Sequence, residues 1–143
     1  MKQKTYSDIK PEKNFDIENV ENGKCTVLFF DNIQEEKAEE NKEKVTFSYD
    51  TFSMEVPYRE NLAEEIEKNI DDWLESAKKK DYDEVAAEIR KQRDELLTST
   101  DWTQMKDTAL SEEKQKKYQE YRQKLRDIPE QPGFPYDVVF PSI

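Results

Sequence analysis

The sequence has no histidine, only two glycines and a single cysteine among its 143 residues. Without histidine, Ser-His-Asp triads, histidine acid–base catalysis and histidine metal sites are excluded. One cysteine and no histidine exclude the usual zinc sites as well, and Gly23 and Gly133 are too far apart to form a glycine-rich loop around a phosphate. No pattern marks two carboxylates that converge in a cleft, as a glycoside hydrolase requires. We therefore expect no catalytic residues, no metal and no cofactor, and a protein that is not an enzyme.

The chain is strongly acidic, with 34 acidic and 23 basic residues and a net charge of −11. Nucleic acid and anionic membranes attract basic surfaces, so neither is expected as a partner. An acidic mimic of DNA is a weaker interpretation, because only the net charge favours it. No apolar run approaches about 18 residues, and the sequence predicts neither a transmembrane helix nor a signal peptide. A lone cysteine, Cys25, forms no internal disulfide, which favours a buried, inert thiol in a reducing cytoplasm.

The first half of the chain is predicted to contain a small sheet. Residues 1–13 are polar and are expected to be loose. The Asn22-Gly23 pair lies between the apolar runs FDIENV and KCTVLFFDNI, and this arrangement favours a two-residue β-hairpin. The acidic stretch QEEKAEENKE (34–43) has little to bury and is predicted to be a surface loop or helical turn.

A further strand is predicted in KVTFSYDTFSMEV (44–56), where the apolar alternation changes phase. This phase change indicates either a β-bulge or a tight turn near Asp50-Thr51. Pro57 ends the strand and suits the entry to a helix. The next apolar residues recur at helical spacing on one face; they are Leu62, Ile66, Ile70, Trp73, Leu74 and Ala77. We expect Trp73 to pack against the sheet.

The stretch KKKD (78–81) is predicted to close this helix, because lysines suit a helix C-terminus and Asp81 suits the cap of a following helix. We therefore divide the chain into an N-terminal module, residues 1–80, and a C-terminal module, residues 81–143. The second module is predicted to contain a helix up to about Leu97 and a third helix that Ser111 caps and Pro129 ends. Their apolar stripes favour an αα-hairpin.

The predicted fold is α+β. It consists of a small antiparallel sheet of two or three strands packed by a helix, then an αα-hairpin, then an extended proline-rich tail. The tail, PGFPYDVVFPSI (132–143), contains three prolines and is excluded from the centre of a sheet. It is expected either to lie extended on the helices or to form an edge strand at Tyr136–Phe140. Its apolar side chains pack on the protein itself or dock into a groove of a partner.

Two arginines of the third helix have no carboxylate at helical spacing. Arg122 has Tyr118 and Arg126 one turn away on either side, and Arg126 is followed by Pro129. Both side chains are either ordinary exposed arginines or anchors for a carboxylate, which lies elsewhere in the protein or on a partner. Two alternatives also exist for Trp102: its side chain either packs between the two helices or contacts a partner.

Several stretches in this half of the chain resemble the bacteriophage tail assembly chaperone family, whose members are often called tail fibre assembly proteins. The resemblance covers about residues 88–141 and rests on RDELL (93–97), TDW (100–102), TQMKDTAL (103–110), YRQKLRDIP (121–129), QPGFP (131–135) and the final Phe140-Pro141. Lys106 stands where the family often has proline, and Phe140-Pro141 stands where it often has tryptophan-proline. These departures affect the details of the loop and the tail.

The resemblance implies a non-enzymatic chaperone in the cytoplasm of a bacterial host. Its expected partner is a phage tail fibre or receptor-binding protein, whose folding or trimerisation it would assist, and it is a possible homo-oligomer. The expected partner-binding residues are Trp102, Tyr121, Arg122, Arg126, Phe134, Pro135 and Phe140. The alternative function is a structural tail or baseplate adaptor of the virion, in which the first module mediates attachment and the helices serve as scaffold.

Overall fold

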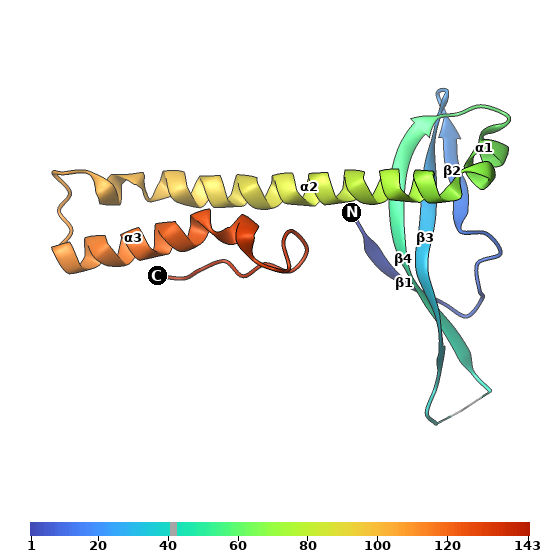
Figure 1. The fold of residues 1–143 in the computed structure, drawn as a ribbon, viewed down its shortest axis with the longest axis horizontal. Coiled ribbons are helices and arrows are strands. Elements are labelled where there is room, and N and C mark those ends of the chain that lie inside the picture. Colours follow the sequence, from blue (N-terminus) through green and yellow to red (C-terminus); the bar gives the residue numbers. More distant parts are fainter. Residues whose placement is uncertain (41–42) are drawn as a thin grey trace. The chain divides into compact units, whose positions relative to one another are not determined.

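The computed structural model describes residues 1–40 and 43–143. These residues form two compact units, Met1–Asp81 and Tyr82–Ile143. The first unit contains a four-stranded antiparallel sheet in the order β1-β4-β3-β2 (Figure 1). Its strands are β1 (Gln3–Ser7), β2 (Phe15–Glu21), β3 (Lys24–Lys37) and β4 (Val45–Pro57).

The predicted hairpin joins β2 to β3. Glu21 pairs with Lys24, and the two residues between them, Asn22 and Gly23, have φ angles of 52° and 73°. Asparagine and glycine tolerate positive φ better than other residues, and two such residues in succession make the tight turn that matches strand twist. The hairpin prediction is confirmed.

The irregularity expected near Asp50-Thr51 lies instead on the neighbouring strand. β4 runs without a turn, whereas the pairing shifts between Asp31 and Gln34 of β3, where one extra residue is accommodated. The phase change in β4 has a simpler cause, because its two halves carry apolar residues on opposite faces. Phe52 lies in the core beneath the helices. Tyr49 lies on the other face, where its ring centre is 5.1 Å from that of Phe30.

The predicted number of strands is wrong, because the expected loose segment contains β1. Its sequence, QKTYS, lacks apolar alternation, and β1 is held instead by pairing with residues 47–51 of β4. A hydrogen bond of 2.8 Å between the Thr5 and Thr51 hydroxyls adds to this pairing. The loop predicted at 34–43 is also corrected, since β3 continues through Lys37; residues 41–42 of that stretch lie outside the described residues.

The predicted order of the helices is wrong as well. A short α1 (Leu62–Lys68) ends at Asn69, and α2 (Ile70–Ser99) then continues through the KKKD stretch where a boundary was expected. Lysine and aspartate are acceptable inside a helix, so a local pattern that resembles a cap does not stop one. The class remains α+β, and the described residues form four strands and the three helices α1, α2 and α3.

The core of the first unit lies between one face of the sheet and the helices. Its buried members are Phe15, Cys25, Val27, Phe29, Phe52, Val56, Leu62, Ile66 and Ala77. Trp73 packs against this cluster, with its ring centre 6.3 Å from that of Phe29, as expected. Cys25 is 1% exposed, and its burial raises the pKa of its thiol. The Lys78 ammonium on α2 donates to Asp31 beside the bulge, and this hydrogen bond lowers the pKa of the Asp31 carboxyl.

The second unit is a helical hairpin with a tail. The later part of α2 runs antiparallel to α3 (Glu112–Arg126), and the short 3-10 helices η1 (Asp101–Gln104) and η2 (Ile128–Glu130) precede and follow α3 (Figure 1). Ser111 caps α3 as predicted, because its hydroxyl accepts the N–H of Lys114 at 3.3 Å. The core cluster contains Tyr121, Leu125 and Ile128, with Ile89, Leu96, Leu97, Tyr118, Phe134, Val138 and Phe140 packed against it.

Candidate protein-binding surface

The connection between α2 and α3 is held by hydrogen bonds from its own polar residues. The hydroxyl of Thr100 donates to the carbonyl of Leu96 at 2.8 Å, where α2 ends. Thr103 is fully buried, and its hydroxyl donates to the carbonyl of Thr100 at 2.6 Å. From α3, the side-chain amide of Gln115 donates to the carbonyl of Thr103 at 3.1 Å. The threonines of the TDWT sequence thus fix the shape of the connection.

Arg122 of α3 ties this connection to the helix pair. Its Nη1 donates to the carbonyl of Leu97 at 2.6 Å and to the hydroxyl of Thr100 at 2.8 Å, and its Nη2 donates to Oδ1 of Asp101 at 2.7 Å. Arg122 is 8% exposed, whereas the Asp101 side chain is 64% exposed. The carboxylate that the sequence could not supply at helical spacing therefore lies within the protein, and the planar guanidinium joins three groups at the end of α2.

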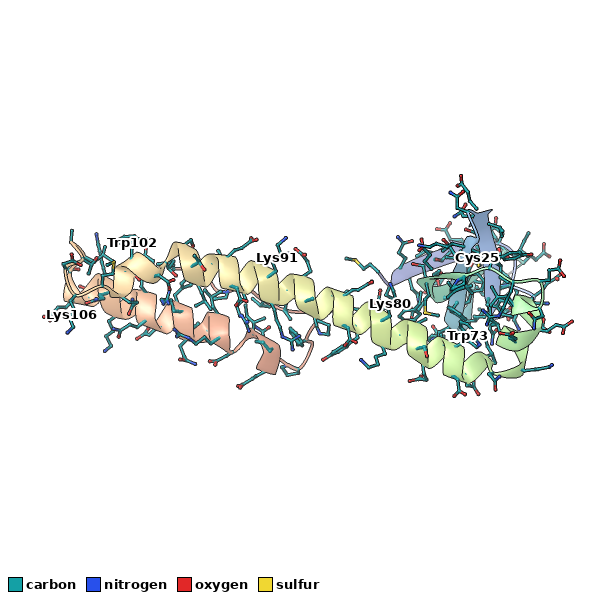
Figure 2. The ribbon with its side chains drawn as sticks, turned by 90° about the horizontal axis from the view of Figure 1, so that it is seen from above. Cys25, Trp73, Lys80, Lys91, Trp102 and Lys106 are labelled. Carbon is teal, nitrogen blue, oxygen red and sulfur yellow. The ribbon has the colours of Figure 1, made fainter. Side chains whose placement is uncertain are left out.

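Trp102 is presented to solvent by this ordered connection. It is 51% exposed, so it does not fill the space between the helices, and its ring centre lies 6.1 Å from that of Tyr118 on α3. Met105 is 57% exposed, and its N–H donates to the carbonyl of Trp102 at 3.4 Å. We call Trp102, Met105 and Tyr118 the Trp102 surface; Figure 2 labels Trp102 and Lys106 at this end of the hairpin.

The structure separates the expected partner-binding residues into exposed and internal ones. Trp102 and Arg126 are exposed. The other residues are internal: Tyr121, Arg122 and Pro135 are buried, and the partly buried Phe134 and Phe140 pack against the core cluster that contains Tyr121. Trp102 is thus the only aromatic residue of the expected set that is more than half exposed among the described residues.

The tail lies on the helices of its own unit. The side-chain amide of Gln131 holds it by donating to the carbonyl of Val139 and accepting the Val139 N–H, both at 2.8 Å. The Phe134 ring contacts that of Tyr82 edge to face, and the Arg90 guanidinium lies 5.1 Å from its centre. The edge strand considered at 136–140 does not form.

A Gly133→Ala substitution should loosen this tail. A Cβ at position 133 would lie 2.2 Å from the backbone oxygen of Asp137, and the Asp137 N–H donates to the Gly133 carbonyl at 2.8 Å, so the turn must open. We expect a loss of about 1–2 kcal/mol in unfolding free energy, measured by urea denaturation. Asp137→Ala is the matched control, because it leaves that backbone oxygen in place. Equal stability of Gly133→Ala and the wild type would contradict this account.

Two residues of the site were not anticipated from the sequence. Met105 lies in the TQMKDTAL stretch, and only its residue type indicated a contact, because the methionine side chain is flexible and polarisable. Asp101, which follows the end of α2, is typical of a loop or cap residue. Its contact with Arg122 joins two motifs that lie 21 residues apart, and no helical or strand periodicity connects such positions.

The second unit is therefore a small helical hairpin that presents an ordered apolar surface at the connection between its helices. Residues 86–143 match the family described as phage tail assembly chaperone protein. The match confirms the resemblance that the motifs indicated and shows that this segment is similar to that family. It covers less than half of the chain, and residues 1–85 lie outside it.

No curated protein and no solved structure matches the chain. Among the described residues, no helix combines the length and the apolar character needed to cross a membrane.

Proposed function

We propose that this protein is a non-enzymatic assembly chaperone of a phage or prophage. It binds a tail fibre or other receptor-binding protein in the cytoplasm of the bacterial host and assists its folding or trimerisation. The C-terminal unit makes the contact, with the Trp102 surface at its centre. The family match of residues 86–143 supports the chaperone role, and the geometry of the connection between α2 and α3 supports the place of contact.

The observation that carries this proposal is that the residues of the TDWT sequence differ in exposure and in their contacts. Its polar residues Thr100, Asp101 and Thr103 are engaged inside the unit, while Trp102 between them is half exposed. Tryptophan is among the residues that contribute most to protein–protein affinity. Because the connection is already ordered, binding costs less conformational entropy than it would for a mobile loop.

The distribution of charge agrees with this assignment. Residues 1–81 contain 21 acidic and 13 basic residues, whereas residues 82–143 contain 13 and 10, so the net charges are −8 and −3. Most of the negative charge thus belongs to the first unit, where it favours solubility. The less charged second unit is the better surface for apolar contact with a client.

Co-expression of this protein with a phage tail fibre from the same genome tests the proposal. With the protein present, we expect a several-fold higher yield of soluble trimeric fibre than without it, measured by size-exclusion chromatography. Equal yields would contradict the chaperone role. Mass spectrometry of purified particles then distinguishes the alternative: an assembly chaperone is absent from particles, whereas a structural adaptor is present in fixed proportion.

A further inference from the structure

An open groove of about 780 Å³ follows the part of α2 that belongs to the second unit. Its lining residues come from successive turns of α2 and are all exposed; they include Ala87, Arg90, Lys91, Asp94, Glu95 and Thr98. The residues of α2 that pack against α3 are different ones, among them Ile89 and Leu96. Figure 2 shows Lys91 on the side of α2 that faces away from α3.

The charges along this groove follow a self-complementary order. Two cations, Arg90 and Lys91, are followed one turn later by two anions, Asp94 and Glu95. If a second copy of the helix lay antiparallel and centred between residues 92 and 93, Arg90 would face Glu95 and Lys91 would face Asp94. At each end of the contact, Ala87 would then face Thr98, and two small side chains would allow the helices to approach closely.

We propose that this face of α2 binds the same face of a second copy of the chain, with the two helices antiparallel around a twofold axis. Such a contact is isologous, because each copy contributes the same residues. Residues 87, 91, 94 and 98 are spaced by four, three and four, which is the spacing of a seam between two packed helices. A parallel arrangement would instead place like charges opposite one another along the whole groove.

Two of the four charged side chains, Asp94 and Arg90, have contacts within each copy. The guanidinium of Arg93 donates to Oδ1 of Asp94 from both Nε and Nη2, and Oδ2 is the oxygen that we expect to accept from Lys91 of the second copy. Arg90 is held over the ring of Phe134. Partial ordering before association lowers the entropic cost of the intermolecular ion pairs.

We expect the dimer to be weak, because the contact is short and its ion pairs are exposed. The twelve residues from 87 to 98 span roughly 18 Å of helix, which is short for a stable interface of about 800 Å² per partner. Exposed ion pairs each contribute about 1 kcal/mol or less. We therefore expect a dissociation constant on the order of 100 µM at low salt, and a further weakening at about 0.5 M salt because the charges are screened.

Sedimentation velocity of charge variants tests the pairing. Lys91→Glu and Asp94→Lys each place like charges opposite one another at two symmetric positions, and each should weaken dimerisation about tenfold or more. The double variant Lys91→Glu/Asp94→Lys exchanges the charges and should restore the dissociation constant to within about threefold of the wild type. Circular dichroism verifies that all four proteins are equally helical. A wild type that stays monomeric at about 500 µM, or a double variant that is folded but not restored, would overturn the proposal.

Disulfide trapping tests the orientation independently of the charges. In a Cys25→Ser background, one chain carries Ala87→Cys and another carries Thr98→Cys. An antiparallel dimer gives mainly the mixed 87–98 disulfide when the two are combined, because only these positions face each other. A predominance of 87–87 and 98–98 disulfides would refute the antiparallel pairing. Neither experiment requires the phage client, so its outcome is separate from that of the chaperone test.

Discussion

Replacement of Trp102 by alanine is expected to weaken client binding at least about 30-fold, which corresponds to roughly 2 kcal/mol for a hot-spot residue. The fold should be little affected. Trp102 is 51% exposed, and its main aromatic contact within the unit is with Tyr118. Loss of one such ring contact costs about 1 kcal/mol. Isothermal titration with the purified client measures the first effect, and urea denaturation measures the second.

A matched control separates a specific contact from a general loss of exposed aromatic surface. Tyr6 in the first unit is 64% exposed and lies outside the segment that matches the family, so Tyr6→Ala should leave client binding unchanged. Met105→Ala should weaken binding by a smaller factor than Trp102→Ala. If Trp102→Ala bound the client like the wild type, the Trp102 surface would not be the contact. A loss of about 3–5 kcal/mol in stability would instead mark Trp102 as a core residue.

Features that depend on neighbouring residues were predictable from the sequence. The hairpin at Asn22-Gly23 needs two adjacent residues that tolerate positive φ, and the cap of α3 needs a serine three residues before the N–H that it accepts. The packing of Trp73 followed from a helical stripe in the same way. In each case the chemistry is contained within a few consecutive positions.

Features that depend on distant pairing were not predictable in the same way. β1 has no apolar alternation of its own, and it becomes a strand because the edge of β4 offers unpaired backbone groups. The continuity of α2 through KKKD shows that a cap-like sequence does not end a helix whose flanking turns are both packed. Helix propensity and capping preferences are worth about 1 kcal/mol per residue, which packing on both sides of the stretch exceeds.

The candidate site combines both situations. The spacing of the third helix showed that Arg122 has no helical carboxylate partner. This left an ordinary exposed arginine, a carboxylate partner elsewhere in the protein, and a carboxylate on a binding partner as alternatives. In the structure the chain turns back after α2, and this turn places Asp101 beside Arg122, which lies 21 positions later in the sequence. The partner of Arg122 therefore lies inside the protein. Trp102 follows Asp101 directly, so the same contact that engages Arg122 also determines where the tryptophan is presented.

An Arg122→Ala variant should therefore strongly destabilise the second unit. It removes the hydrogen bonds to Asp101, to the buried Thr100 hydroxyl and to the Leu97 carbonyl. The Leu97 carbonyl keeps the weaker bonds that it accepts from the N–H and hydroxyl of Thr100. We expect a loss of about 2–4 kcal/mol in unfolding free energy, measured by urea denaturation. Arg126→Ala, an exposed arginine one turn further along α3, should stay within about 0.5 kcal/mol of the wild type.

Two further variants separate the structural role of Arg122 from its charge. Arg122→Lys retains the positive charge, but a single ammonium cannot reach three acceptors in different directions, so most of the loss should remain. Asp101→Asn keeps an acceptor for Nη2 and removes only the charge, and because Asp101 is 64% exposed it should cost about 1 kcal/mol or less. Under conditions in which Arg122→Ala is still folded, it should also bind the client more weakly, because the connection that presents Trp102 is no longer fixed. Wild-type client affinity in that folded variant would show that the Trp102 surface does not depend on this contact.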